Sequence, residues 1–296
     1  MAKKYTIGYV YPESDNSLDD KILIRQLKKR FNVILFPLEK QDDPNQIEKQ
    51  AKLCKLIVNG AVYEPFTWEG IELSKSFEEF QVKVINSSHS FYYQEDKWMF
   101  YLECLEHKMP TPVTYLVSKK LNYNKEKIKK LLVEGPIVIK AVFSDKGLCV
   151  ERAKTFEEFS NKIKKIINKN PISPVIVQKF IEHGSVGYKV FMIGDKSIQG
   201  VAIKGKTWEQ TGSKETEHYR VFRPDKKLRD ICKKAPRAFG MKWCSLDFIK
   251  QDKNWYIIEV NGCPSISLVS RNNRDMERIS KMLVNHIYHE VEKISK

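Results

Sequence analysis

The sequence predicts an α/β protein made of several lobes. Short apolar segments typical of strands alternate along the chain with longer segments in which apolar residues recur at helical spacing. The first three segments, at residues 5–11, 18–31 and 33–36, predict a strand, a helix and a second strand. Because β-α-β units usually build a mostly parallel sheet, we expect the chain to begin with an α/β domain.

This N-terminal domain is expected to cover residues 1–90. Two further strand-like segments, at residues 56–58 and 82–85, continue the alternation, and a helix is predicted between them at residues 71–80. The spacing of these elements is typical of a compact domain with its own sheet.

A second lobe is expected over residues 91–174. It opens with a helix at residues 98–107, which Pro110 and Pro112 end before a strand at 113–117. The remaining segments predict a lysine-rich helix, a strand at 137–140, a polar loop, a strand that runs through Val150 and a helix at 156–167. This lobe therefore combines strands and helices without strict alternation, as in α+β proteins.

A third lobe, residues 175–296, is expected to be rich in strands. The strands are predicted at residues 175–178, 188–193, 197–203, 243–249 and 255–261. Helices are predicted at 228–239 and 276–294, and the polar, pattern-poor residues 205–222 are expected to form a loop over the site.

Composition indicates a globular, cytoplasmic protein. The chain has 296 residues, of which 42% are hydrophobic and 30% are charged, enough for lobes with real cores. No apolar run approaches the ~18 to 20 residues of a membrane span, and the N-terminus shows no signal peptide. The six cysteines have no CxxC spacing, so neither a zinc site nor a disulfide framework is indicated.

The net charge of +15 suggests an anionic partner, such as a nucleotide, a polyphosphate or an acidic peptide. Forty-two of the 52 basic residues are lysine, and a lysine-biased proteome is the alternative explanation. A nucleic-acid partner is disfavoured because arginine, the usual base reader, is scarce and no recognised nucleic-acid motif is present.

Three oxygen-bearing side chains interrupt the last two predicted strands. Asp247 lies in the first of them and Glu259 and Asn261 lie in the second, with a polar turn at residues 251–254 between the strands. Strand alternation places Glu259 and Asn261 on one face, and antiparallel pairing sets Asp247 opposite Glu259. Facing carboxylates are costly unless a cation lies between them, and oxygen ligands suit Mg²⁺. The alternative is a solvent-facing side of the hairpin.

Lys140 ends the strand at 137–140 inside an apolar run. A lone buried ammonium group is costly, so a phosphate partner is the simplest explanation. Taken in chain order with Asp247, Glu259 and Asn261, which we call the metal triad, these features resemble the ATP-grasp superfamily over nearly the whole chain. The resemblance implies an ATP-grasp fold with an N-terminal Rossmann-like domain, a central lid lobe and a C-terminal catalytic lobe. It also implies ATP and Mg²⁺ as cofactors, with the metal triad binding Mg²⁺.

The resemblance further implies how the nucleotide is held. Lys140 and Lys97 are expected to bind the phosphates, and residues 144–147 resemble the lid over them, for which a plain β-turn is the alternative. Residues 175–181 resemble the hinge whose backbone contacts the adenine edge, with a buried strand as the alternative. The implied nucleotide-binding residues of the hinge and the strand after it are Gln178, Lys179, Phe180, Ile181 and Lys189.

Two branches of the superfamily share this arrangement and differ near the hinge. The ribosomal-protein glutamate ligase (RimK-like) type carries Asp-x-Arg, where this chain has Gly187 and Lys189. Residues 178–194 are similar instead to the inositol 1,3,4-trisphosphate 5/6-kinase (inositol-tetrakisphosphate 1-kinase) family, through the pattern Gln-x-Phe-Ile-x-His-x-x-Val-x-Tyr-Lys-Val-Phe. The region from residues 84–88 through residues 112–114 looks at least as similar to the ligases as to the kinases.

We therefore expect a kinase that phosphorylates a hydroxyl of an inositol polyphosphate. The alternative is a RimK-like ligase that joins an amino acid such as glutamate to a peptide or small-molecule acceptor through an acyl phosphate. Lys146 and Lys189 are expected to stabilise the transferred phosphoryl group. Together with these lysines, His183, Asn261 and Ser265 are expected to line the substrate pocket. For His183 and Ser265, a loop cap and a turn residue are the alternatives.

Overall fold

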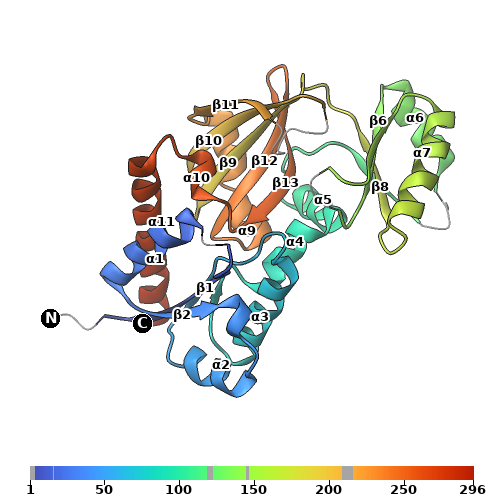
Figure 1. Ribbon diagram of the computed structural model, residues 1–296. Helices are drawn as coiled ribbons and strands as arrows, with labels where there is room; N and C mark the ends of the chain where they lie inside the picture. The colour runs from blue at the N-terminus through green and yellow to red at the C-terminus, as the bar shows by residue number, and fades with distance from the viewer. Residues whose placement is uncertain (1–3, 16, 119–122, 145–146, 209–215) are drawn as a thin grey trace.

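The computed structural model describes residues 4–15, 17–118, 123–144, 147–208 and 216–296. These residues form three sheets with helices packed against them, and the sheet rich in green in Figure 1 stands apart at one side with its own two helices. None of the described helices is both long enough and apolar enough to cross a bilayer.

The first sheet is parallel and has the strand order β2-β1-β3-β4. Its strands are β1 (Thr6–Tyr11), β2 (Asn32–Pro37), β3 (Ile57–Asn59) and β4 (Val84–Ile85), and its helices are α1 (Leu18–Arg30), α2 (Pro44–Ala51) and α3 (Thr67–Glu79). Helix α1 begins where the Ser17 hydroxyl accepts a hydrogen bond from the Asp19 amide, and basic residues fill its last turn. The β-α-β opening predicted from the sequence is confirmed.

Short helices lead from the first sheet to the second. They are η2 (Ser88–Phe91), α4 (Tyr92–Glu95) and α5 (Lys97–Glu106), whereas η1 (Leu38–Lys40) follows β2 within the first domain. The Asp96 carboxylate caps α5 by accepting hydrogen bonds from the amides of Trp98 and Met99. Helix α5 contacts α9 and β13, so its first residue, Lys97, is fixed beside the third sheet.

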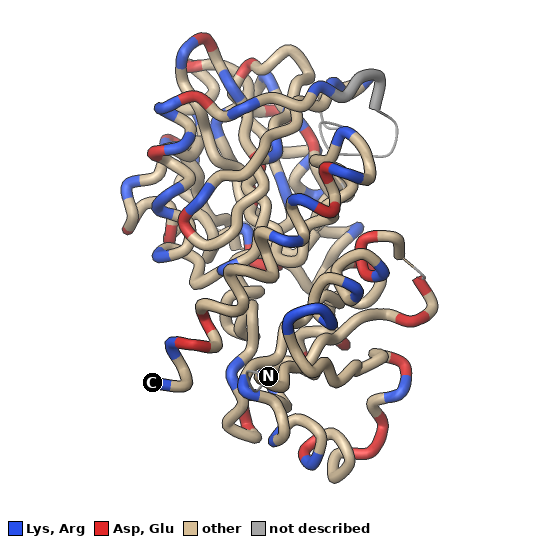
Figure 2. Tube along the Cα trace, turned by 90° about the vertical axis from the view of Figure 1, so that its left-hand side faces the viewer, with Lys and Arg blue, Asp and Glu red and all other residues tan. Residues whose placement is uncertain are grey.

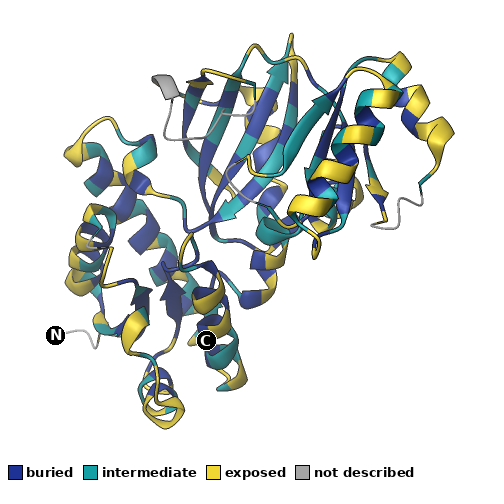
Figure 3. Cartoon of the chain, turned by 45° about the vertical axis from the view of Figure 1, so that its right-hand side comes forward, coloured by how far each residue is buried: buried dark blue, intermediate teal, exposed yellow. Residues whose placement is uncertain are grey.

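The second sheet is antiparallel, with the order β5-β8-β6-β7. It comprises β5 (Thr114–Val117), β6 (Ile137–Ala141), β7 (Val150–Ala153) and β8 (Val175–Lys179), covered by α6 (Lys125–Val133) and α7 (Phe156–Lys169). Both helices bury one face against the sheet and expose the other (Figure 3). The second lobe was expected to end at residue 174, immediately before β8. Because β8 pairs within the second sheet, a boundary after residue 179 fits the proposed three-part division better.

The third sheet has the order β11-β10-β9-β12-β13 and is antiparallel. Its strands are β9 (Val186–Ile193), β10 (Lys196–Gly205), β11 (Thr216–Phe222), β12 (Trp243–Gln251) and β13 (Asn254–Gly262). Its helices are α8 (Lys226–Cys232), α9 (Ala235–Phe239), α10 (Ile266–Val269) and α11 (Asn273–Ile294).

Two details of this lobe differ from the sequence prediction. Residues 216–222, expected to be part of a loop, form β11, which lies at the sheet edge and therefore lacks the apolar character of a central strand. The single helix expected at 228–239 is two helices, and the second carries a proline, Pro236, in its first turn.

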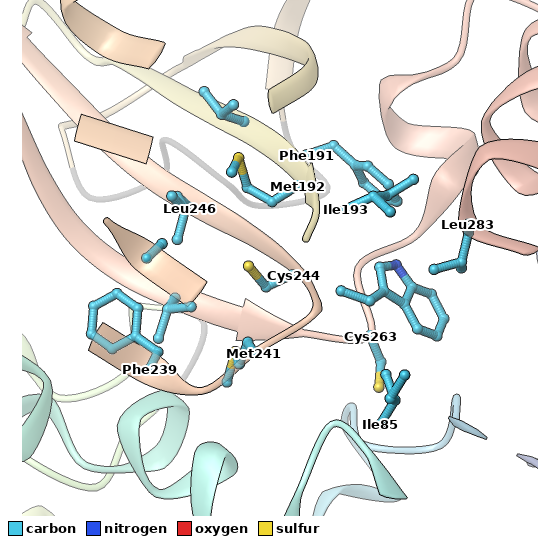
Figure 4. Packing of buried hydrophobic residues seen from close by; sticks show 14 of the residues in the cluster. Ile85, Phe191, Met192, Ile193, Phe239, Met241, Cys244, Leu246, Cys263 and Leu283 are labelled. Atoms are coloured by element: carbon cyan, nitrogen blue, oxygen red, sulfur yellow. The ribbon is translucent and has the colours of Figure 1, made fainter. Parts of the chain in front are cut away.

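The first and third sheets share one core. In Figure 4, Ile85 of β4 lies beside Cys263, which follows β13, and Leu283 of α11 packs near the third sheet. A buried polar link adds to this contact, because the Asn86 side chain donates to the Trp243 carbonyl at 2.6 Å and accepts from the Lys242 amide at 2.8 Å. The start of β12 is thus held firmly against the N-terminal part of the chain.

Candidate active site

The hairpin of β12 and β13 brings the metal triad together. Asp247 pairs directly with Glu259, as predicted, and Asn261 follows Glu259 by two residues on the same strand. The register shifts between Asp247 and Phe248, so that β13 has an additional residue, Ile258, at this point. Such a bulge turns the strand locally, and Ile258, Glu259 and Asn261 all face one cavity.

This cavity gathers most of the residues predicted for the nucleotide and the metal. It lies between the second and third sheets and has a volume of about 230 Å³. The predicted residues that line it are Lys97, Lys140, Gln178, Lys179, Phe180, Ile181, His183, Lys189, Asp247, Glu259 and Asn261. Ser144 and Gly147 of the predicted lid also line it, whereas Lys146 lies outside the described residues.

Lys140 projects from β6 into the cavity, although its strand neighbours Ile139 and Ala141 are fully buried. Its ammonium group donates a hydrogen bond to the Gln178 side chain at 3.2 Å. Burial, together with the positive charge of Lys97, lowers the pKa of Lys140 to about 8. Two ammonium groups that are close together in a desolvated cavity repel each other when no anion is present. The pair of Lys97 and Lys140 is therefore suited to an anionic ligand.

Lys97 reaches the same cavity from the first turn of α5. Its ammonium group donates a hydrogen bond to the backbone carbonyl of Ser144, at the start of the predicted lid. Two ammonium groups from different elements thus meet at one end of the cavity, which is the arrangement expected of a polyphosphate site.

Lys189 and Asp247 face each other on neighbouring strands. They are paired in the register of β9 and β12, and their side chains form an ion pair in which both are largely buried, with 16% and 14% of the side chains exposed. Lys189 therefore supplies positive charge next to the metal triad, as well as to any phosphoryl group that enters the cavity.

The triad fits a hard divalent cation. The Oδ1 atom of Asp247 is buried and has no hydrogen-bond partner among the described residues, although it lines a cavity. The described residues contain no group of three or more His, Cys, Asp or Glu side chains placed to hold a metal. Two carboxylates and one amide are oxygen ligands only, and Mg²⁺ usually takes few protein ligands when substrate phosphates supply the rest.

The hinge residues line the cavity, but their backbone is partly engaged. The Lys179 amide donates to the Val113 carbonyl at 2.9 Å, and the Phe180 amide donates to the Pro136 carbonyl at 3.1 Å. The Lys179 ammonium pairs with Glu134 at 2.8 Å. The backbone N–H groups of Lys179 and Phe180 are therefore already engaged within the protein.

Several apolar residues of the cavity were not predicted from the sequence. They are Pro112, Val138, Val150, Ile249 and Ile258, and Trp208 joins them from the end of the segment after β10. Two of them could have been inferred, because Val138 and Ile249 lie two residues from Lys140 and Asp247 and so share a strand face with them. Trp208 has no such strand neighbour, but it falls within residues 205–222, which were expected to form a loop over the site.

Ser265 does not join this cavity. Its hydroxyl donates to the Asp19 carboxylate at 2.6 Å, and it lines a second cavity of about 250 Å³ between α1 and the segment after β13. Cys263, in the wall of the same cavity, donates to the Asn59 carbonyl at 2.7 Å, and burial raises the pKa of its thiol to about 12. A thiol of this kind is a packing group and not a nucleophile.

A family model for the RimK-like ATP-grasp domain matches residues 94–285, which include the whole cavity. The chain belongs to the RimK-like ATP-grasp family. Enzymes of the ATP-grasp superfamily use ATP and Mg²⁺ in general, in agreement with the donor set of the cavity.

Curated relatives of the chain are ligases. It is 25% identical over 210 residues to the probable alpha-L-glutamate ligase of Parasynechococcus marenigrum, a match that covers 68% of this chain and 42% of the relative. It is 26% identical over 218 residues to the alpha-aminoadipate–LysW ligase LysX of Saccharolobus solfataricus, covering 70% of this chain and 74% of the relative. The probable alpha-L-glutamate ligase of Trichodesmium erythraeum is also 25% identical, in a match that covers 68% of this chain and 66% of the relative.

Solved structures show the same fold over the whole chain. D-alanine–D-alanine ligase from Bacillus anthracis complexed with ATP superposes with a TM-score of 0.69 at 14% identity, covering 98% of each chain. A RimK domain ATP-grasp protein from Sphaerobacter thermophilus gives a TM-score of 0.66 at 14% identity, covering 95% of this chain and 98% of the other. The predicted ATP-grasp fold is therefore confirmed.

The expectation of an inositol polyphosphate kinase is wrong, because the family model and the relatives are those of ligases. The resemblance rested on residues 178–194, which form the end of β8, the connection after it and strand β9. This segment lines the cavity or lies within the sheets, so its pattern alone does not distinguish a kinase from a ligase.

Proposed function

We propose that this protein is an ATP- and Mg²⁺-dependent carboxylate–amine ligase. The observation that carries the proposal is a single cavity in which two lysines, Lys97 and Lys140, lie at one end together with the metal triad. The curated relatives, all ligases by name, support the same reaction class.

The residues of the chain divide the chemistry between them. Lys97 and Lys140 bind the phosphates of ATP, and Lys189 neutralises charge on the γ-phosphoryl group as a substrate carboxylate oxygen attacks its phosphorus. The bond from phosphorus to the bridging oxygen breaks, and ADP leaves with the electron pair. An amine then attacks the carbonyl of the acyl phosphate, and inorganic phosphate leaves as the amide forms and the amine loses a proton.

Asp247, Glu259 and Asn261 would hold Mg²⁺, which neutralises the phosphate charge when it is bound. Lys146, expected from its place in the lid, is a further candidate to contact the transferred group. Asn261 and Lys189 also face the space where a carboxylate would meet the γ-phosphoryl group. Because ATP is an intracellular substrate, a cytoplasmic location is proposed.

The amino acid and its acceptor are proposed by class only. The names of the relatives favour an acidic amino acid such as glutamate as one substrate, and a peptide or a small molecule as the other. In the view of Figure 2, basic and acidic residues are interspersed along the described part of the chain, so their distribution there does not indicate the acceptor. The match also spans well under half of the Parasynechococcus marenigrum relative, so the activity of the whole protein belongs to this proposal.

The test is a screen of the purified chain with ATP, Mg²⁺, single amino acids and hydroxylamine. Hydroxylamine intercepts an acyl phosphate as a hydroxamate, so the carboxylate substrate is expected to give ADP, phosphate and a coloured iron–hydroxamate complex. Pools of peptides and small molecules then replace hydroxylamine to identify the amine partner by mass. Stable phosphorylation of a hydroxyl, with no release of inorganic phosphate, contradicts the ligase proposal.

A further inference from the structure

The second cavity, about 250 Å³ in volume, is acidic although the chain carries a net charge of +15. Asp15, Asp19 and Asp20 line it, and none of the described residues that line it is basic. Carboxylates that gather without a cation repel one another and are costly to desolvate. This cavity is therefore suited to a cation, whereas the first cavity, between the second and third sheets, gathers lysines.

The two walls of the second cavity come from opposite ends of the chain. Asp19 and Asp20 lie in the first turn of α1, which contacts α10 and α11 (Figure 1). The Asp19 carboxylate accepts hydrogen bonds from the Ser265 hydroxyl at 2.6 Å and from the Ser267 amide at 3.1 Å. These bonds join α1 to the segment that follows the metal triad, so the acidic groups are fixed beside it.

The other hydrogen-bond partners of the aspartates are also neutral. Asp20 accepts from the Tyr9 hydroxyl, and Asp15 accepts from the Tyr63 hydroxyl at 2.7 Å. Within the described ranges of the chain, none of the three aspartates forms an ion pair. Burial, and to a smaller extent the charges of Asp19 and Asp15, raises the pKa of the Asp20 carboxyl to about 6. A positive group in the cavity would relieve this repulsion.

Trp243 gives the cavity a feature that is independent of the aspartates. It lines the cavity from the start of β12 and is only 4% exposed. Its indole Nε1–H is buried and has no acceptor among the residues that the structure describes. Because a buried indole N–H usually finds an acceptor, a ligand with an acceptor oxygen as well as a positive charge would match this wall.

The two cavities are neighbours along the chain. Asn261 of the metal triad lines the first cavity, and Cys263 lines the second. Two residues of extended chain span at most ~7 Å. An amine substrate with an aliphatic arm of about that length, as in lysine, can therefore place one amino group in each cavity.

We propose that the amine substrate is a basic amino acid of the lysine type, bound in the second cavity by the carboxylates of Asp15, Asp19 and Asp20 and by the indole N–H of Trp243. One amino group pairs with the aspartates, and the substrate carboxylate accepts from Trp243. The other amino group reaches the first cavity for the amide-forming step described above. The inference rests on the proposed function in taking this ligand as the amine substrate.

The proposal also excludes a class of amine. Glutamate has a net negative charge and would be repelled by three aspartates without a basic side chain beside them. The acidic amino acid that the names of the relatives favour would then serve this chain only as the carboxylate substrate.

The first experiment measures binding by calorimetry without ATP, at a pH well above the pKa of Asp20. The ligands are L-lysine, L-norleucine, which lacks the side-chain amine, cadaverine, which lacks the carboxylate, and L-glutamate. Lysine should bind most tightly, cadaverine and norleucine more weakly, and glutamate not at all. Binding of norleucine or glutamate as tight as that of lysine overturns the proposal.

The aspartates are tested by removal of one charge at a time. Asp20→Asn and Asp15→Asn should each weaken lysine and cadaverine roughly tenfold, the order expected for loss of a charge-assisted hydrogen bond. Asp15 is exposed, so its variant tests the charge without a change in buried packing. Asp42→Asn, at an exposed position before α2, is the matched control and should bind both ligands as the natural chain does. Unchanged affinity in both cavity variants contradicts the proposal.

Trp243→Phe separates the indole N–H from the ring. It should weaken lysine and spare cadaverine, because only lysine brings an acceptor to the N–H group. A general disturbance of packing would weaken both ligands equally. Equal loss of both, or no loss of either, overturns the role assigned to Trp243.

These binding measurements need neither ATP nor the carboxylate substrate, so they are separate from the test of the ligase reaction. Lysine binding that depends on the aspartates, without any product in the hydroxylamine screen, would remove the proposed function and leave the cavity as a site for a basic amino acid. Ligation to the amine of glutamate, without binding of lysine, would overturn this inference and leave the proposed function intact.

Discussion

The two ends of the first cavity, between the second and third sheets, are built in different ways. At the charged end, strands place most of the groups: Lys140 on β6, Lys189 on β9, and the metal triad on β12 and β13, with Lys97 added from the first turn of α5. At the aromatic end, Phe180, His183 and Trp208 all lie outside the strands, in connecting segments. Strand register fixes the position of charges closely, whereas the rings depend on contacts with each other and with Arg152.

This difference assigns separate tasks to the two ends. Transfer of a phosphoryl group requires charges in fixed positions, because misplacement of a catalytic group is costly to the rate. Binding of a base tolerates small movements of the rings, since stacking depends weakly on their orientation. Variants at the charged end should therefore reduce turnover, binding of the phosphates or both, and variants at the aromatic end should reduce affinity for the nucleotide alone.

Asp247→Asn should have the largest effect. It removes a carboxylate from the metal triad while keeping the shape of the side chain, so ATP turnover should fall roughly 1000-fold with little change in thermal unfolding. Asp252→Asn, in the exposed turn of the same hairpin, is the matched control and should keep full turnover. If purified Asp247→Asn turned over ATP at the natural rate, the assignment of the triad would be wrong.

Lys140→Met should come next, with a loss of ATP affinity of ~100-fold. The natural chain should also show a pH dependence, because a lysine with a pKa of about 8 carries its charge below this pH and loses it as the pH rises through it. ATP affinity should fall above about pH 8, and ATP binding near that pH should take up protons, measured by calorimetry in buffers of different ionisation enthalpy. The methionine variant should lack this proton uptake, and its persistence there would point to another group.

Phe180→Ala should weaken Mg-ATP by roughly tenfold and leave the turnover of bound ATP nearly unchanged. The physical reason is that the ring is proposed to contact the base and not the reacting phosphorus. Phe180→Tyr keeps the ring and serves as the control. A large fall in kcat at saturating ATP would show that the two ends of the cavity are not separate in function.

Ser265→Ala should have the smallest effect on the nucleotide. Ser265 lies at the second cavity, hydrogen-bonded to Asp19, and not among the residues that line the first. Affinity for Mg-ATP, measured by calorimetry, should match that of the natural chain. A clear loss of affinity for Mg-ATP would mean that the second cavity is energetically coupled to the proposed nucleotide site.

Much of the charged end could be predicted from the sequence. A carboxylate or an ammonium group inside an apolar strand is unusual, and alternation then gives its face, so the pairing of Asp247 with Glu259 followed without a structure. The β-α-β opening was also predictable, because the apolar residues of its strands and of its helix recur with strong periodicity. Ser265 lies at the second cavity and not beside Asn261, because proximity along the chain does not imply proximity in space after the strand has ended, and its role in a substrate pocket stays a prediction.

Phe180 and His183 were expected at the site from the resemblance, but the arrangement of the aromatic end could not be predicted from periodicity or charge. Trp208 lies after β10 in a polar segment without periodicity, and its neighbours, Phe180 and Arg152, are distant in sequence and belong to other elements. The reaction class was also missed, since the residues near the hinge, on which that expectation rested, do not by themselves distinguish a kinase from a ligase. Neither periodicity nor charge identifies the second substrate.

The most direct test of the proposed ligase reaction follows an oxygen-18 label from the substrate carboxylate to inorganic phosphate. The carboxylate substrate found in the hydroxylamine screen is labelled with oxygen-18, and the chain is supplied with ATP, Mg²⁺ and the amine. A ligase that forms an acyl phosphate transfers one labelled oxygen from each carboxylate to inorganic phosphate, which mass spectrometry detects. Release of unlabelled phosphate, or transfer of the γ-phosphoryl group to a hydroxyl, would contradict the account.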